Sequence, residues 1–205
     1  MDKYHIALTF IEPLLGTAPL DKEVYRTYII EKTKREGREL SEEEIAQELM
    51  TLNVDDEMEK GTTGFHRLDD GAPILYDYVV KGFFKDACGM LARAPESGSS
   101  KVRAYKKIID GLVFVAPRQI PIAMNGFEIG ILERPLRAQT AQGERVALAR
   151  SEMIPAGASI GVNVLILGQV KEELLREWLI YGALRGLGQW RNASYGRFVY
   201  ELSKA

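Results

Sequence analysis

The hydrophobic residues of the chain fall into short strand-like runs and a few longer segments with helical spacing. A first strand is expected at residues 4–10, where β-branched and aromatic residues alternate, and it ends before Pro13 and Gly16. The region 107–167 is rich in short apolar runs that Pro, Gly and Asn separate. The strands expected in this region are 112–115, 127–132, 145–154 and 159–167. The last strand of the chain is expected at 197–202.

Apolar residues at helical spacing predict helices over 20–34, 41–52, from about 78 to 93, and 170–184. The helix at 41–52 has the clearest start, because Ser41 followed by Glu44 forms a capping box. The helix at 170–184 has the most regular apolar face, which includes Trp178.

The expected order is a strand, a helical insertion, a helix, several strands, a helix and a strand. Without the insertion this order approximates β-α-β-β-α-β, an α+β fold of the ferredoxin-like (RRM-like) kind with additional strands. An antiparallel sheet with two helices on one face is the expected core. We therefore expect a single domain over 1–205 with a largely helical, acidic insertion at 17–72.

The composition excludes several classes of protein. The 205 residues are 46% hydrophobic and 27% charged, which is ordinary for a globular chain. Because no apolar run reaches the length of a membrane helix and the N-terminus has no signal-peptide pattern, we expect a cytoplasmic protein without a membrane partner. Cys88 is the one cysteine, and it forms no metal-ligand set with the two histidines. No P-loop or dinucleotide motif occurs either, so we expect no metal and no cofactor.

The charges are unevenly distributed, although the formal net charge is only −2. Acidic residues predominate between 21 and 60, and basic residues predominate between 81 and 118 and again near the C-terminus. Local basic patches determine the affinity for phosphate even when the net charge is close to zero. The alternative is that each charged stretch is simply a solvated face.

Four short segments occur in an order that resembles a known family. They are EPLLG at 12–16, KGFFK at 81–85, IPAG at 154–157 and GLGQWRNASYGRF at 186–198. In the RAMP superfamily (repeat-associated mysterious proteins), the backbone subunits of CRISPR effector complexes, a first strand ends in a TPL-Gly turn. A segment IPG-S-S-x-K-G-x-x-R then opens the first helix. The chain closes with IPAG, a strand, a helix, a Gly-rich loop and a GFGR strand.

The resemblance covers most of the chain except 17–72, and it implies an RNA-binding subunit in antiviral defence. It implies single-stranded RNA as partner, with further copies of the chain or other effector subunits. Two departures weaken the expectation that the backbone cradles phosphate: Tyr78-Val79-Val80 replaces the small serines, and Gln189-Trp190 and Asn192-Ala193 replace glycine and serine.

Residues 186–197, here named the closing loop, carry most of the candidate binding residues. Glycines permit positive φ and close approach of N–H groups to phosphate, arginines add bidentate contacts, and aromatic rings offer faces for unpaired bases. The alternative is that the glycines cap the helix and Trp190 packs on the sheet. The candidate nucleic-acid-binding residues are Lys81, Lys85, Lys106, Lys107, Gly186, Gly188, Trp190, Arg191, Tyr195 and Arg197.

A polar segment before the third helix offers candidate catalytic residues. His66, with a nearby Arg or Lys, could serve as general acid or general base in metal-independent RNA cleavage. Asp69 and Asp70 could instead activate a 2′-hydroxyl or hold magnesium. Some RAMP relatives cleave RNA with a His or an Asp in a loop near this place. The alternative is that these are ordinary turn residues.

The sequence thus favours a RAMP-like protein that grips single-stranded, guide-type RNA through the closing loop and the basic patches. An enzyme is the less favoured interpretation, and it would be a stand-alone endoribonuclease. A third is a phage or prophage protein that imitates an effector subunit and docks on a host complex, with the acidic insertion in a basic channel.

Overall fold

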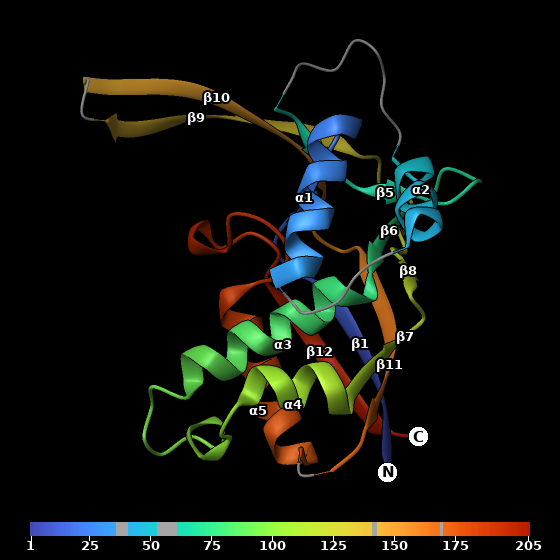
Figure 1. Cartoon of the computed structure of the whole chain (residues 1–205), viewed down its shortest axis with the longest axis vertical. Coiled ribbons are helices and arrows are strands. Elements are labelled where there is room, and N and C mark those ends of the chain that lie inside the picture. Colours follow the sequence, from blue (N-terminus) through green and yellow to red (C-terminus); the bar gives the residue numbers. More distant parts are fainter. Residues whose placement is uncertain (36–40, 53–60, 141–142, 169) are drawn as a thin grey trace. The chain divides into compact units, whose positions relative to one another are not determined.

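The computed structural model describes residues 1–35, 41–52, 61–140, 143–168 and 170–205. The fold is mixed α+β with antiparallel sheets, and the chain divides into two compact units (Figure 1). Unit 1 comprises Met1–Leu14, Ile74–Glu128 and Ile154–Ala205. Unit 2 comprises Leu15–Pro73 and Ile129–Met153.

Unit 1 is built on a four-stranded sheet whose order is β12-β1-β11-β7. The strands are β1 (Asp2–Phe10), β7 (Val113–Ala116), β11 (Ser159–Ile166) and β12 (Phe198–Lys204). All neighbours are antiparallel; Ile6 of β1, for example, lies opposite Val162 of β11 and Leu202 of β12. Since β1 begins beside the end of β12, the two termini lie close together (Figure 1).

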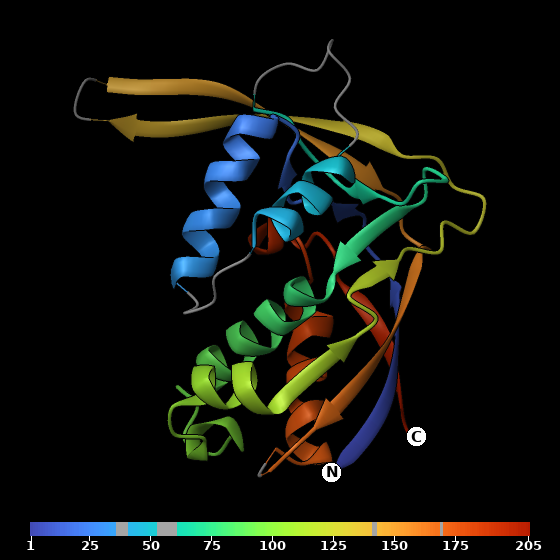
Figure 2. The same ribbon diagram turned by 45° about the vertical axis from the view of Figure 1, so that its right-hand side comes forward.

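Three helices cover one face of this sheet (Figure 2). They are α3 (Asp77–Leu91), α4 (Tyr105–Leu112) and α5 (Glu172–Arg185). Residues of β1 alternate between buried and accessible, as expected for a sheet with one covered face. The core beneath the helices contains the fully buried rings of Phe84 and Trp178, whose centroids are 5.6 Å apart. The indole N–H of Trp178 donates to Ser99 Oγ at 3.0 Å.

Shorter elements complete unit 1. β6 (Pro73–Tyr76) pairs antiparallel with β8 (Gln119–Pro121), and the 3-10 turns η1 (Ser99–Lys101) and η2 (Arg191–Ala193) lie in connecting segments.

Unit 2 contains two helices and a long hairpin. The helices are α1 (Lys22–Arg35) and α2 (Glu42–Met50), and β9 (Gly130–Thr140) pairs antiparallel with β10 (Gly143–Ile154). β4 (Thr63–Gly64) runs parallel to β10 and antiparallel to β3 (Ala18–Pro19); β2 (Leu14–Leu15) and β5 (His66–Arg67) are equally short. The predicted capping box at Ser41 and Glu44 is present at the start of α2.

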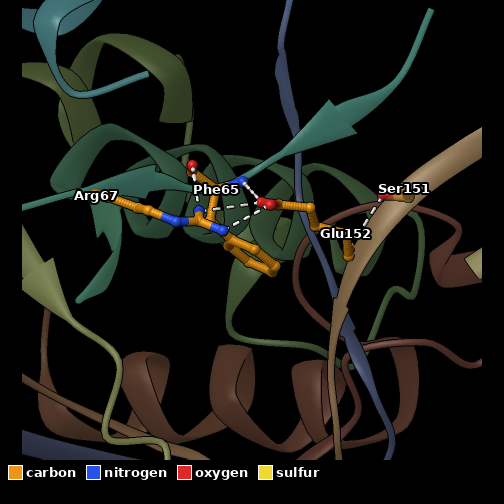
Figure 3. A network of polar contacts seen from close by, with 4 residues as sticks. All are labelled: Phe65, Arg67, Ser151 and Glu152. Carbon is orange, nitrogen blue, oxygen red and sulfur yellow. Dashed lines mark hydrogen bonds and ion pairs between the residues drawn. The ribbon is translucent and has the colours of Figure 1, made fainter. Parts of the chain in front are cut away.

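A buried ion pair links β10 to the segment after β4 in unit 2 (Figure 3). Glu152 is 4% exposed, and its carboxylate accepts from the guanidinium of Arg67 at 2.6 and 3.2 Å and from the backbone N–H of Phe65 at 2.8 Å. Ser151, the residue before Glu152, contacts Thr63 Oγ1 through its Oγ at 2.9 Å and donates to Gly16 O at 3.1 Å. A Cβ at Gly16 would overlap the backbone of Gly64, so the glycines let two chain segments cross here.

The largest differences from the sequence-based expectation concern β9 and α4, and the short strands β2, β3, β4, β5, β6 and β8 were not predicted either. The strand expected at 127–132 begins at Gly130 and extends to Thr140 instead, because Asn125 and Gly126 adopt positive φ and the N–H of Phe127 bonds to Met124 O in a turn. Helix α4 was not predicted. The described part of the expected insertion at 17–72 lies within unit 2 and holds α1 and α2 together with short strands and loops. A largely helical insertion within a single domain stays a prediction.

Within the described ranges, no helix is long and apolar enough to cross a membrane. The same ranges hold no group of three or more His, Cys, Asp or Glu side chains that could bind a metal ion.

Candidate nucleic-acid interface

The closing loop is folded back on itself by its glycines. The N–H of Leu187 donates to Gly196 O at 2.9 Å, and the N–H of Gly196 donates to Pro13 O at 2.8 Å. Gly186 and Gly196 have φ of 90° and 71°, and a Cβ on either would overlap a carbonyl oxygen across the loop. The close approach that these two glycines permit is therefore used by the protein itself. Five backbone N–H groups of the loop are already bonded, namely those of Gly186, Leu187, Ala193, Ser194 and Gly196.

Three arginines surround the loop. Arg191 donates to Asp86 of α3 at 2.7 Å, in an ion pair whose two side chains are 28% and 29% exposed. Arg197 donates through Nε to Ala183 O at 3.2 Å, and Arg185 donates to Asn192 Oδ1. Arg185 and Arg197 thus lie at the C-terminal end of α5, where the helix dipole also favours cations, whereas the guanidinium of Arg191 is bonded to α3.

The two aromatic residues of the loop contact each other. The rings of Trp190 and Tyr195 meet edge to face with centroids 6.1 Å apart, and both residues are half-buried. Asn192, Ala193 and Ser194 at the tip are exposed, and Gly188 is half-buried. Base stacking by Trp190 and Tyr195 stays a prediction.

The two lysines of α3 reach towards α4. Lys81 Nζ donates to the carbonyl oxygen of Asp110 at 2.9 Å and lies 5.3 Å from the ring centroid of Phe114. Lys85 Nζ lies 3.0 Å from the carboxylate of the same Asp110, and its side chain is only 15% exposed. Both lysines therefore help to fix α4 against α3, and phosphate would have to compete with Asp110 for them.

The basic stretch at α4 is differently placed. Lys106 and Lys107 lie in the first turn of α4 and are exposed, as are Lys101 and Arg103 just before it. These side chains can meet a polyanion without first breaking an ion pair within the described ranges.

This fold is similar to that of a chain in a solved structure. A chain of the cryo-EM structure of the type III-B Cmr-beta complex bound to cognate target RNA superposes with a TM-score of 0.53 at 9% sequence identity. The match covers 99% of this chain and 61% of that one, so this chain spans less than two thirds of its length. A chain of a type IV-B CRISPR complex matches with a TM-score of 0.47 at 11% identity, over 98% of this chain and 90% of that one. No protein-family model and no curated protein matches the sequence.

The candidate catalytic residues lie in unit 2. His66 is 6% exposed; its Nδ1 is hydrogen-bonded to Thr51 Oγ1 at 2.8 Å, and its ring meets that of Tyr25 edge to face at 5.1 Å. Asp69 and Asp70 are exposed, and Asp70 Oδ1 accepts from the N–H of Ala72 at 3.0 Å in a turn. These contacts give His66 a packing role and Asp70 a turn role. Catalysis by the three residues stays a prediction.

Cys88 lies in the apolar side of α3 and is fully buried. Burial raises the pKa of its thiol above the ordinary value, so the thiol is a poorer nucleophile than an exposed one.

Sequence reasoning missed one group of residues, namely Tyr76, Tyr78 and Arg118. Their contacts join the end of β6 and the start of α3 to the residue before β8. No local sequence pattern predicts the contact between Arg118 and Tyr76, because all of α3 and α4 lies between them in the chain.

Proposed function

We propose that this chain is an RNA-binding protein of the RAMP type, which grips single-stranded, guide-type RNA through the closing loop and the basic stretch before and within α4. Its partners would be further copies of itself or other subunits of a CRISPR-related effector complex. In this proposal the order β12-β1-β11-β7 with α3 and α5 is the ferredoxin-like core, because the chain visits it as β-α-β-β-α-β.

The observation that carries the proposal is the set of three arginines, Arg185, Arg191 and Arg197, that lie in or directly before a loop whose tip is exposed. Asp86 is the carboxylate that pairs with Arg191, whereas Arg185 and Arg197 donate to neutral oxygen atoms. Two of the three guanidinium groups have no counter-charge in these contacts. This part of the surface therefore retains a positive potential, which an RNA phosphate backbone would neutralise.

The similarity to the chain of the Cmr-beta complex supports the fold in this proposal, and the RNA contacts are argued from the residues of this chain. The burial of His66 speaks against RNA cleavage by this histidine, since a general acid or base must reach the ribose of its substrate.

The experiment is a salt titration of RNA binding followed by fluorescence anisotropy. The chain should bind labelled single-stranded RNA at low salt, and the affinity should fall steeply as salt is added, because bound counterions are released. Arg191→Gln should weaken binding to all sequences and lower the slope of log K against log salt by about 1.

Arg176→Gln is the matched control, because Arg176 is an exposed arginine of α5 that pairs with Glu172 four residues earlier. It should leave affinity and slope unchanged. Absence of binding at low salt, or equal binding by the Arg191 variant and the wild type, would overturn the proposal for this loop.

A further inference from the structure

Two tyrosines form a parallel stack where β6 passes into α3. The ring centroids of Tyr76 and Tyr78 are 5.3 Å apart, and the ring planes differ by 6°. Tyr76 is the last residue of β6 and is 1% exposed, whereas Tyr78 lies in the first turn of α3 and keeps part of its surface accessible. The inner ring is therefore part of the core, and the outer ring reaches the surface.

Two backbone contacts and one side-chain contact fix the position of Tyr76. Tyr76 lies opposite Gln119 in the pairing of β6 with β8. The N–H of Asp77, the next residue, donates to Arg118 O at 2.8 Å. The guanidinium carbon of Arg118 lies 5.8 Å from the centroid of the Tyr76 ring, within the range of a cation–π contact. Because backbone and side chain both fix Tyr76, the ring that stacks on it is also pre-organised.

The charges near the stack are of both signs. Arg118 and Lys81, the latter three residues after Tyr78 on the same side of α3, are positive, and Asp77 is negative. The carboxylate of Asp77 would repel a bare phosphate bound at this place. A nucleobase is neutral and needs a flat apolar face, which a pre-ordered tyrosine provides at little entropic cost.

We propose that Tyr78 is a stacking seat for an unpaired base of single-stranded RNA, backed by Tyr76 and with Arg118 beside it. This inference rests on the proposed function and adds a contact to a base at the start of α3, apart from the contacts proposed for the closing loop and α4. The site holds one base of any identity, because every base has a π-face.

The test compares Tyr78→Ala with Tyr78→Phe on two probes of equal length, labelled oligoadenylate and a labelled abasic strand. Tyr78→Ala should weaken oligoadenylate binding by about tenfold, and Tyr78→Phe should bind like the wild type because it keeps the ring. Neither variant should change the affinity for the abasic strand.

A second readout follows the base directly. An RNA that carries 2-aminopurine should lose fluorescence when the wild type binds it, because stacking quenches that base, and the loss should be smaller when Tyr78→Ala binds it at saturation. Unchanged oligoadenylate affinity in Tyr78→Ala, or an equal loss on both probes, would overturn the stacking seat while RNA binding by the wild type leaves the proposed function intact. Failure of the wild type to bind either probe would overturn both.

Discussion

Replacing Glu152 by glutamine is expected to lower the free energy of unfolding by about 3–5 kcal/mol. The substitution keeps the shape of the side chain but removes the charge that Arg67 pairs with, and the two side chains are 5% and 16% exposed. A buried guanidinium without its carboxylate carries a desolvation penalty that its remaining bond to Phe65 O does not offset. Urea unfolding followed by circular dichroism measures the loss.

Glu133→Gln on the same hairpin is the matched control. Glu133 pairs with Arg150 at 2.8 Å, opposite it in the β9–β10 register, but its side chain is 47% exposed. Because exposed ion pairs contribute little, this variant should lose at most about 1 kcal/mol. Equal losses in the two variants would contradict the account of the buried pair.

Replacing Gly196 by alanine is the second large expected effect, with a loss of about 2–4 kcal/mol in unfolding free energy. The φ of 71° strains any residue with a Cβ, and the new methyl group would overlap the carbonyl oxygen of Leu187. Since a backbone atom is in the way, the loop must open to accept the change. RNA affinity should therefore fall together with the stability, and thermal unfolding and anisotropy can be measured on the same sample.

Gly82→Ala is the control for a glycine without these constraints. Gly82 lies inside α3, and an added Cβ would meet nothing within 4 Å beyond its own helix. Alanine there should stabilise the protein by about 0.5–1 kcal/mol. If Gly196→Ala unfolds no more easily than the wild type, the loop is not closed in the way described here.

Local patterns predicted a large part of the fold. The capping box at Ser41, the alternating residues of β1 and the apolar face around Trp178 each act within a few residues of the chain, and each element is where the pattern put it. Helix α4 escaped although Ile108, Ile109 and Leu112 have helical spacing, because it is only eight residues long and follows a turn in which Ala104 has a φ of 51°. The extent of β9 escaped because a turn at Asn125 and Gly126 displaces its start.

The candidate site could be predicted only as residue types. That glycines and arginines gather near the C-terminus is visible in the sequence. That Arg191 pairs with Asp86, or that both α3 lysines contact Asp110, depends on tertiary packing of residues far apart in the chain. The same limit applies to the stack of Tyr76 and Tyr78 with Arg118, and these contacts decide which cations are available to RNA.

The most direct test of the central claim is to cross-link single-stranded RNA carrying 4-thiouridine to the chain and identify the modified peptides by mass spectrometry. The account predicts cross-links in the closing loop and around α4, and their loss in competition with unlabelled RNA. Cross-links confined to unit 2, or no cross-link at low salt, would contradict it.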